Sequence, residues 1–377
     1  MILVHLLVAL AVIIAATRLV GHLFQRIDQP AVIGELVGGI LLGPSLLGWV
    51  APEVSAWLLP PSVVPLLRLH AQAGVIFFMF LVGLELDGRM IRQSSRAMII
   101  ISHASIVLPF ILGYGLAHVL YPRLSPPSVQ FTPFALFIGV SMSITAFPVL
   151  ARILRDRGLN RTRMGNVAMA CAAVNDVAAW CLLALVISIS EFGDWGSAIT
   201  HMPGVVAEQL GHYAIFAAFL AGALMPKKAR IGGALHDRLA SLLSLLFLPV
   251  FFAFSGIRTQ IGLVSGAANW GLCAAIIAVA CTGKFGGSVA AARLTGIGWR
   301  DSAALGVLMN TRGLVELVVL NIGLDLGVIS PTLFTMLIIM ALATTFMTSP
   351  LLQLLLRKNP WPTALQQRCS VAVDSPR

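Results

Sequence analysis

Asp176 is the residue whose type and position raise the clearest chemical question. It follows Asn175 in the stretch AAVNDVAAW, residues 172–180, and no other charged residue occurs from Met164 to Ser190. If this apolar run is a helix, a rise of about 1.5 Å per residue puts the carboxylate roughly 18–20 Å from either end. A charge at the centre of a bilayer is unfavourable by about 3 kcal/mol on insertion scales, so such residues usually face a bundle interior or a watery cavity. We therefore predict that Asp176 loses a proton and takes a cation, with Asn175 supplying a ligand oxygen. A structural ion pair is the alternative.

A polar interruption precedes a proline in the neighbouring apolar segment, SMSITAFPVLARIL, residues 141–154. Proline removes a helical hydrogen bond and clashes with the preceding turn. Ser141, Ser143 and Thr145 before Pro148 therefore predict a helix that is broken at membrane depth. Freed carbonyls and half-helix ends at such a break can coordinate ions or offset their charge. A simple proline kink, with the hydroxyls bonded back to the helix, is the alternative.

A second interruption lies in the other half of the chain, in GVLMNTRGLVELVVLN, residues 306–321. Arg312 and Glu316 are four residues apart and can pair on one helix face. Alone, this stretch is as readily structural as functional. Together with the first interruption, it indicates two broken helices in two halves, which is typical of transporters built from inverted repeats.

Two further charged residues lie within apolar segments. Lys284, in CTGKFGGSVAAAR, needs a partner for its charge or loses its proton. Asp176 is a candidate, and the sequence leaves their contact open, while the glycines around Lys284 allow another helix to cross closely. Glu35 lies in GELVGGILLG, where we expect a structural role for it and close helix packing from glycines spaced four apart.

The composition indicates the elements that must position these residues. The chain has 377 residues, of which 58% are hydrophobic and 11% are charged, with a mean hydropathy of +0.93. Soluble domains have about 25% charged residues, so the sequence predicts an all-α polytopic membrane protein without a soluble domain.

We expect residues 1–358 to form one transmembrane unit, followed by a short cytoplasmic tail, 359–377. Eleven segments are long enough to span a bilayer: residues 2–22, 30–50, 63–86, 94–120, 131–153, 164–190, 205–225, 239–258, 267–292, 300–322 and 331–356.

The net charge of +10 reflects membrane topology. Lys and Arg gather in alternate loops between the apolar segments, and positively charged loops stay in the cytoplasm. This pattern predicts a multi-pass protein of the cell membrane, with its N-terminus outside and its C-terminus in the cytoplasm. No nucleic-acid motif is present, so we expect the lipid bilayer, and no nucleic acid, as a partner.

Several of these stretches resemble the monovalent cation:proton antiporters, in the branch of the plant cation/proton exchangers and their Kef-like bacterial relatives. The resemblance runs from about Val32 to Leu352. It is carried by GELVGGILLGPSLLG, FLVGLELD, SITAFPVLARIL, AAVNDVAAW and LMNTRGLVELVVLNIGLDLGVIS. It implies an all-helical, inverted-repeat antiporter fold, in which a core domain with two crossing broken helices moves against a panel domain that forms homodimers.

The resemblance also implies a site and an activity. Asp176 would bind H⁺ and a monovalent cation, K⁺ or Na⁺, in alternation, and exchange would be electroneutral. We expect no cofactor and no resident metal ion, only a transient alkali cation at Asp176. The expected cation and proton site consists of Asp176, Asn175 and Thr145, supported by Lys284, Arg312, Ser143 and Glu316.

One stretch departs from the family pattern. Such antiporters typically have thirteen spans, and residues 191–211 are too few for about two helices that relatives place there. By resemblance, the lost helices are the linker between the repeats and one panel helix. The alternatives are therefore a shortened, non-transporting relative that acts as a scaffold or sensor, and a cation channel. A membrane enzyme is disfavoured because no HExxH, no GxGD and no paired Ser and His at matched depth are present. The sequence does not distinguish K⁺ from Na⁺.

Overall fold

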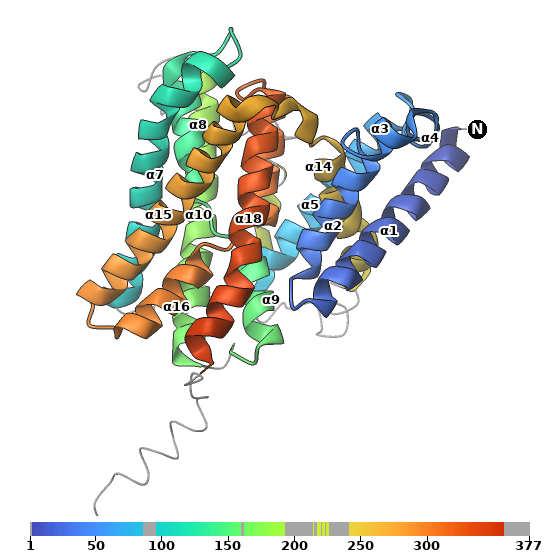
Figure 1. Ribbon diagram of the computed structural model, residues 1–377. Coiled ribbons are helices and arrows are strands. Elements are labelled where there is room, and N and C mark those ends of the chain that lie inside the picture. The colour runs from blue at the N-terminus through green and yellow to red at the C-terminus, as the bar shows by residue number, and fades with distance from the viewer. Residues whose placement is uncertain are drawn as a thin grey trace, which may run out of the picture.

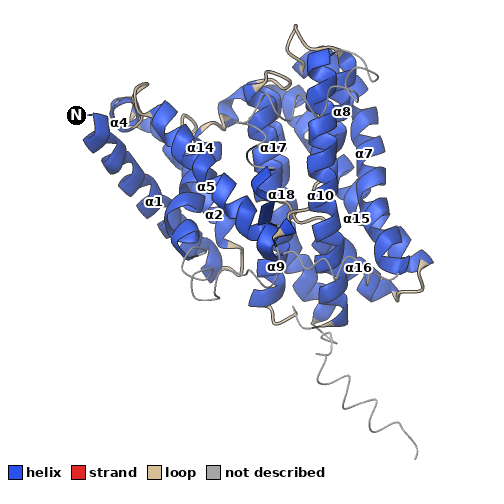
Figure 2. Cartoon of the chain, turned by 180° about the vertical axis from the view of Figure 1, so that it is seen from behind, coloured by secondary structure: helices blue, strands red, loops and turns tan. Residues whose placement is uncertain are grey.

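A computed structural model describes residues 2–85, 96–159, 162–192 and 241–357, together with residues 214, 217–219, 221, 222, 224 and 225. The regular structure of these residues is helical, without a β-strand (Figure 2). Within them, nine helices are long and apolar enough to cross a membrane, and ten when one bent pair is taken as a single span. The all-α prediction is confirmed, and ten of the eleven predicted spans have a counterpart. The eleventh, 205–225, lies mostly outside the described residues, as does the predicted tail, 359–377.

Six of the spans form a core domain, on the left in Figure 1. It consists of two sets of three, and in each set a broken helix lies between two continuous ones, as the inverted-repeat prediction requires. The first set is α7 (Arg96–Leu124), α8 (Phe131–Ser143) with α9 (Phe147–Asp156), and α10 (Arg163–Phe192). The second is α15 (Gly266–Leu294), α16 (Trp299–Met309) with α17 (Leu314–Asp325), and α18 (Pro331–Leu356).

The remaining helices form a panel domain, on the right in Figure 1. Its long members are α1 (Ile2–Arg26), α2 (Ala31–Leu42), α5 (Val64–Glu85) and α14 (Leu248–Ile257), which the π-helical η2 (Leu243–Phe247) precedes. Short elements are α3 (Leu47–Val50), α4 (Pro52–Leu58) and η3 (Ile261–Leu263). The second span was predicted as one helix over 30–50, but α2 ends at Leu42. Pro44 lies two residues further on, where it cannot donate the backbone hydrogen bond that would continue the helix.

The glycines of α2, and Gly43 directly after its end, let neighbouring helices approach closely, as their spacing predicts. A Cβ on Gly34 would lie 2.6 Å from the Cα of Gly21 on α1, and one on Gly43 would lie 2.9 Å from the Cα of Ile257 on α14. Both distances are shorter than real Cβ contacts. Backbone therefore packs against backbone, which holds the panel together without long side chains.

Gly39→Ala is expected to destabilise the panel. An added Cβ would overlap the Ala253 backbone of α14, whose carbonyl carbon would be only 2.8 Å away. Overpacking of this kind costs about 1–3 kcal/mol, so the thermal unfolding midpoint in detergent should fall. The control is Gly115→Ala on α7, where no heavy atom lies within 4 Å of the added carbon. Equal midpoints for the two variants would contradict the close packing of α2 on α14.

Candidate functional site

The first broken helix is interrupted where the sequence predicts. α8 ends at Ser143, Ile144 and Ala146 have extended backbone angles, and α9 begins at Phe147 with Pro148 in its first turn. Proline is well tolerated in a first turn, because the N–H it lacks would have no helical partner there. Pro148 therefore permits a helix to restart here, and the backbone of the preceding residues is left to find other partners.

The second break crosses the first and supplies those partners. α16 ends at Met309 and α17 begins at Leu314, with the two axes bent by 41°. The Ala146 N–H donates to the Thr311 carbonyl at 3.0 Å, and the Thr145 hydroxyl donates to the Met309 carbonyl at 2.8 Å. Non-helical backbone at membrane depth is stable only where protein or water satisfies it. Here donors in the first break form hydrogen bonds with backbone carbonyls of the second break.

Asp176 lies on α10 beside this crossing, with 1% of its surface exposed. Among the described residues, neither of its carboxylate oxygens has a hydrogen-bond partner. The backbone N–H of Phe147, at the N-terminus of α9, and the Lys284 ammonium group both act electrostatically on the carboxylate. The N-terminus of a helix carries a partial positive charge, so the restart of α9 places a fixed dipole beside an anion that is otherwise unpaired.

Asn175 connects three helices around Asp176. Lys284 determines which end of the Asn175 amide faces it. An ammonium group only donates hydrogen bonds, so it must face the amide oxygen. The amide oxygen therefore faces Lys284 Nζ at 3.1 Å, and it lies 3.0 Å from both Ser105 Oγ on α7 and Thr145 Oγ1 in the first break. The amide nitrogen faces two backbone carbonyls at 3.3 Å. Of the predicted residues, Asn175, Thr145 and Lys284 thus lie together, next to Asp176.

Lys284 does not form the direct ion pair with Asp176 that the sequence left open, since no such pair lies within 4.0 Å in the described part of the chain. It is fully buried on α15, and its ammonium group bonds to Asn175, the residue that precedes Asp176. The neighbouring glycines let α7 cross closely, as predicted: a Cβ on Gly283 would lie 2.8 Å from the Cα of Pro109. The helix that carries the lysine is therefore packed tightly against α7.

Arg312 binds the end of α8 from the second break. Its Nη1 donates to the Ser141 carbonyl at 2.7 Å and its Nη2 to the Met142 carbonyl at 2.8 Å, while Nη1 also pairs with Glu316 at 3.1 Å. The last carbonyls of a helix lack intrahelical partners and carry partial negative charge. The predicted Arg312–Glu316 pair is confirmed, and Glu316 lies in the first turn of α17, where an acidic residue suits the helix dipole.

Two side chains that the sequence did not indicate take part in these contacts, and one that was expected at the site does not. Ser105 contacts Asn175, and the Thr345 hydroxyl on α18 accepts from the Arg312 N–H at 3.0 Å and donates to the Arg312 carbonyl at 2.9 Å. Single hydroxyl residues are common in membrane helices, so neither position carried a signal. Ser143 does not join the site, because its hydroxyl donates to the carbonyls of Gly139 and Ile106.

A cavity of about 440 Å³ lies between the two domains and approaches the first break. Pro148 and Val149 of α9 line it from the core, and Phe78, Phe252 and Glu35 line it from the panel. A second cavity, of about 570 Å³, shares Arg152 and Asp156 of α9 with the first. Glu35, for which a structural role was expected, is thus an acidic residue on the wall of the cavity between the two domains.

Comparison with known proteins agrees with this architecture. The family model for the transmembrane region of sodium/hydrogen exchangers matches residues 8–202 and 197–358. The solved structure of the sodium proton antiporter MjNhaP1 from Methanocaldococcus jannaschii matches with a TM-score of 0.60 and 15% identity, over 95% of this chain and 98% of that one. At this identity, the likeness concerns the fold.

Three curated relatives are more similar in sequence. The Na⁺/H⁺ antiporter NhaS4 of Synechocystis sp. is 41% identical, over 92% of this chain and 96% of its own length. The cation/H⁺ antiporter 17 of Arabidopsis thaliana is 38% identical, over 92% of this chain and 48% of its own length. The K⁺/H⁺ antiporter 1 of Saccharomyces cerevisiae is 33% identical, over 88% and 44%. The chain therefore spans nearly all of the cyanobacterial relative and about half of the plant and yeast ones, and it belongs to the sodium/hydrogen exchanger family of cation/proton antiporters, which are transporters and not enzymes.

Proposed function

We propose that this chain exchanges a monovalent cation, Na⁺ or K⁺, for H⁺ by alternating access at Asp176. The observation that carries the proposal is a fully buried carboxylate without a hydrogen-bond partner in the described residues, beside the crossing of two broken helices. The printed names of the relatives, which include Na⁺/H⁺ and K⁺/H⁺ antiporters, support the same reaction.

The chemistry is a competition for one carboxylate. A proton or an alkali cation neutralises Asp176, and each excludes the other. Asp176 and Thr145 offer the oxygen ligands that hard cations prefer, while Asn175 ties Lys284 to the site at 3.1 Å. A ligand shifts a two-state equilibrium only through its differential affinity for the two states. Coupling therefore requires that the core domain move readily when Asp176 has bound a proton or a cation. It must move poorly when the carboxylate is deprotonated and has no cation bound.

The residue types favour electroneutral exchange. The neighbour of Asp176 is an amide, Asn175, so the pair has one carboxylate to neutralise. Replacing one H⁺ with one monovalent cation at this carboxylate leaves the charge of the moving core unchanged. The membrane potential then does no work on the transport step.

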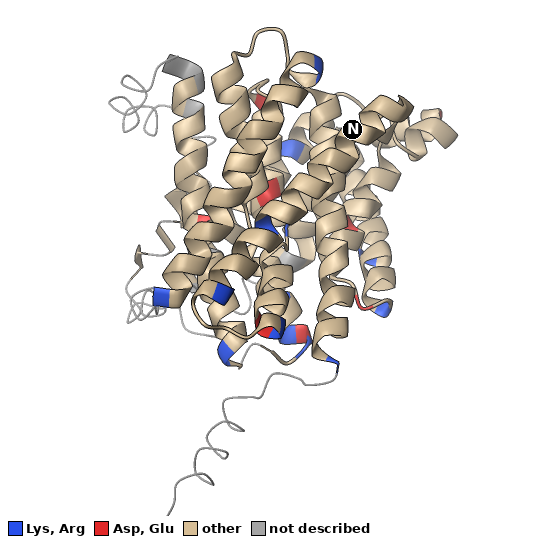
Figure 3. Cartoon of the chain, turned by 60° about the vertical axis from the view of Figure 1, so that its left-hand side comes forward, with Lys and Arg blue, Asp and Glu red and all other residues tan. Residues whose placement is uncertain are grey.

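The charge distribution supports a cytoplasmic position for the large cavity. Lys and Arg gather toward the end of the molecule at which α9 and α18 finish (Figure 3), with Arg26, Arg155 and Arg293 in the last turns of α1, α9 and α15. By the positive-inside rule this end faces the cytoplasm. The cavity between the domains lies at the same end, so the conformation is inward-open in this orientation.

The shortened segment after α10 does not remove the site. The alignment with the cyanobacterial relative covers 392 positions, more than the 377 residues of this chain, and the two family matches meet at residues 197–202. Both findings support an internal deletion near 191–211. The six core spans, with both breaks, are retained, which favours a transporter over a scaffold or sensor. A cavity on one side of the site favours a carrier over a channel.

Ion exchange in proteoliposomes tests the proposal. Purified protein is reconstituted with a pH dye inside the vesicles, and K⁺, Na⁺ and Li⁺ are added outside in turn. At least one of K⁺ and Na⁺ is expected to drive proton efflux at a rate well above that of protein-free vesicles, and a voltage-sensitive dye should record no change in potential. A cation current without proton movement would identify a channel, and no flux with any cation would support the non-transporting alternative.

A further inference from the structure

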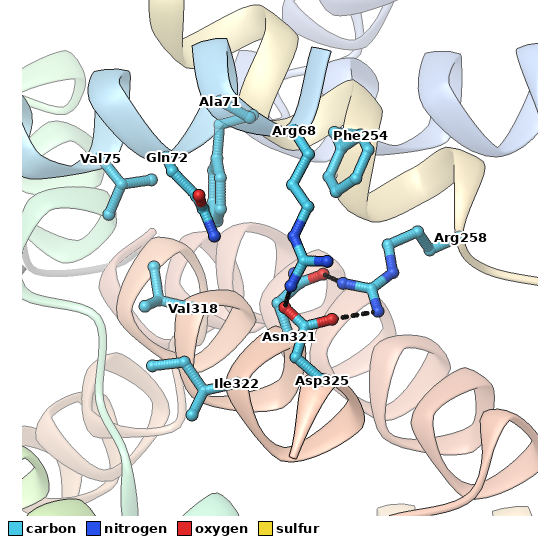
Figure 4. A pocket seen from close by; sticks show the side chains of 11 residues that line it. Arg68, Ala71, Gln72, Val75, Phe254, Arg258, Val318, Asn321, Ile322 and Asp325 are labelled. Atoms are coloured by element: carbon cyan, nitrogen blue, oxygen red, sulfur yellow. Dashed lines mark hydrogen bonds and ion pairs between the residues drawn. The ribbon is translucent and has the colours of Figure 1, made fainter. Parts of the chain in front are cut away.

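A group of charged and polar residues joins the two domains at the end opposite the large cavity. Asp325, the last residue of α17, binds two arginines: its Oδ1 lies 2.6 Å from Arg258 Nη2, and its Oδ2 accepts from Arg68 Nη2 (Figure 4). One turn earlier on α17, Asn321 accepts from Arg258 Nη1 at 2.8 Å and donates to Ser255 Oγ at 2.8 Å. Each of these links runs from a core helix to the panel, because Arg68 is on α5, Ser255 is on α14 and Arg258 follows it.

The carboxylate that these ion pairs share is better shielded than those of a surface pair. The Asp325 side chain is 11% exposed, while Arg258 is 21% and Arg68 is 42% exposed, so the Arg258–Asp325 pair is the better shielded of the two. The partners of the Arg152–Asp156 pair within α9 are 46% and 62% exposed and 3.8 Å apart. The Arg258 guanidinium also lies over the rings of Phe254 and Phe334, 5.7 and 5.8 Å from their centroids. Exposed pairs contribute about 0–1 kcal/mol, and shielded pairs are screened less by salt.

The domain boundary is closely packed around these residues. The space that Arg68, Arg258 and Asp325 border, lined also by Val75, Val318 and other side chains, is about 40 Å³, against about 440 Å³ for the cavity at the other end. The two ends of the boundary between core and panel are thus opposite in character. One is wide and reaches the first turn of α9 at the first break, and the other is narrow and held by charges.

We propose that Asp325, Arg68 and Arg258 form an outer gate, which holds the outward side closed in this conformation and must open in each transport cycle. The proposal rests on alternating access at Asp176, as proposed above. When the core moves against the panel, Asp325 moves with α17 while both arginines stay with α5 and α14. Both ion pairs then break, so they stabilise the inward-open state and set the ratio of the two states.

Thiol labelling in intact cells tests the outer gate without requiring transport. The five native cysteines are replaced by serine, and Val318→Cys places a reporter in the narrow space. An impermeant maleimide is added outside. Asp325→Asn, which keeps the shape and removes the charge, is expected to raise the labelling rate about tenfold, the population change that corresponds to ~1.4 kcal/mol. Arg258→Gln should act in the same direction.

The matched control is Glu53→Gln, which removes a negative charge from an exposed position on α4 of the panel, away from the boundary between the domains. Its labelling rate should equal that of the parent. An unchanged rate in both Asp325→Asn and Arg258→Gln would overturn the gate. An equal rise in Glu53→Gln would also overturn it, because the effect would then reflect net charge alone.

Cross-linking provides a second measurement if Asp325→Asn folds poorly. In the same background, Arg68→Cys with Asp325→Cys is treated with a short bis-methanethiosulfonate. Exchange should stop on cross-linking and return after reduction, and exchange that persists in the cross-linked protein would overturn the gate. Ion exchange by the parent protein is measured in parallel, which separates the two proposals. If the parent shows no exchange, the proposed antiport is wrong. A changed labelling rate in Asp325→Asn would still support the outer gate.

Discussion

Asp176→Asn is expected to reduce cation-driven proton movement to the level of protein-free vesicles. An asparagine has nearly the same shape as the aspartate but can neither release a proton nor neutralise an alkali cation. Both halves of the exchange fail together, because both ions use the same carboxylate. The measurement is the dye assay in proteoliposomes, with the variant reconstituted at the same protein density as the parent.

If Asp176→Asn does not exchange ions, a measurement must show that the variant is still folded. The Asp176 carboxylate is buried and makes no hydrogen bond among the described residues. Removing such a charge relieves a desolvation penalty, so the thermal midpoint of the variant should equal or exceed that of the parent.

Stabilisation by ligand gives an independent readout of Asp176. A cation at 100 times its Kd raises stability by about 2.7 kcal/mol, and this rise should be present in the parent and absent in Asp176→Asn. Glu53→Gln, which removes a negative charge from an exposed residue of α4, should retain both exchange and stabilisation. Full exchange in Asp176→Asn would refute the assignment of this residue.

The sequence predicts the elements of this fold well because membrane spans follow from apolar length. The last predicted span, 331–356, coincides with α18 (Pro331–Leu356). A polar run followed by a proline marked the first break and a polar run alone marked the second, because each disturbs the helical backbone locally. The end of α2 at Leu42 was missed, since apolarity continues past Pro44 and length alone carries no information on a bend.

Contacts between distant residues were predicted less well, and the reason is geometric. The Arg312–Glu316 pair was found because its members are only four positions apart in the sequence. The contacts of Arg312 with the carbonyls of Ser141 and Met142 join residues about 170 positions apart, and a carbonyl has no sequence signature. Lys284 was matched with Asp176 by charge, yet it bonds to the amide of the adjacent residue, Asn175.

The outer gate shows the same limit at the boundary between domains. Arg68, Arg258 and Asp325 lie near the ends of their helices, where charged residues are ordinary. Neither arginine is close to Asp325 in the sequence, so nothing in the local pattern indicates that they meet. Their pairing follows from how the core sits against the panel, which the sequence of either domain alone does not specify.

Arg312→Leu is expected to lower the free energy of unfolding by about 3–5 kcal/mol, the usual cost of removing one partner from a buried ion pair. Glu316 would be left as an uncompensated buried charge, and the carbonyls of Ser141 and Met142 would lose their donors. Folded proteins are stable by only about 5–15 kcal/mol, so the yield of folded protein should fall as well. Unfolding by titration with sodium dodecyl sulfate in mixed micelles measures the change.

Two companion variants separate the charge of Arg312 from its geometry. Arg312→Lys keeps the charge but cannot span two carbonyls and a carboxylate, so its loss should be intermediate. The double variant Arg312→Leu with Glu316→Leu removes the unpaired charge, and it should be more stable than Arg312→Leu alone, which gives a negative coupling in the double-mutant cycle. If Arg312→Leu were as stable as the parent, the guanidinium would not be holding the end of α8, and the two breaks would be stabilised by their mutual backbone contacts alone.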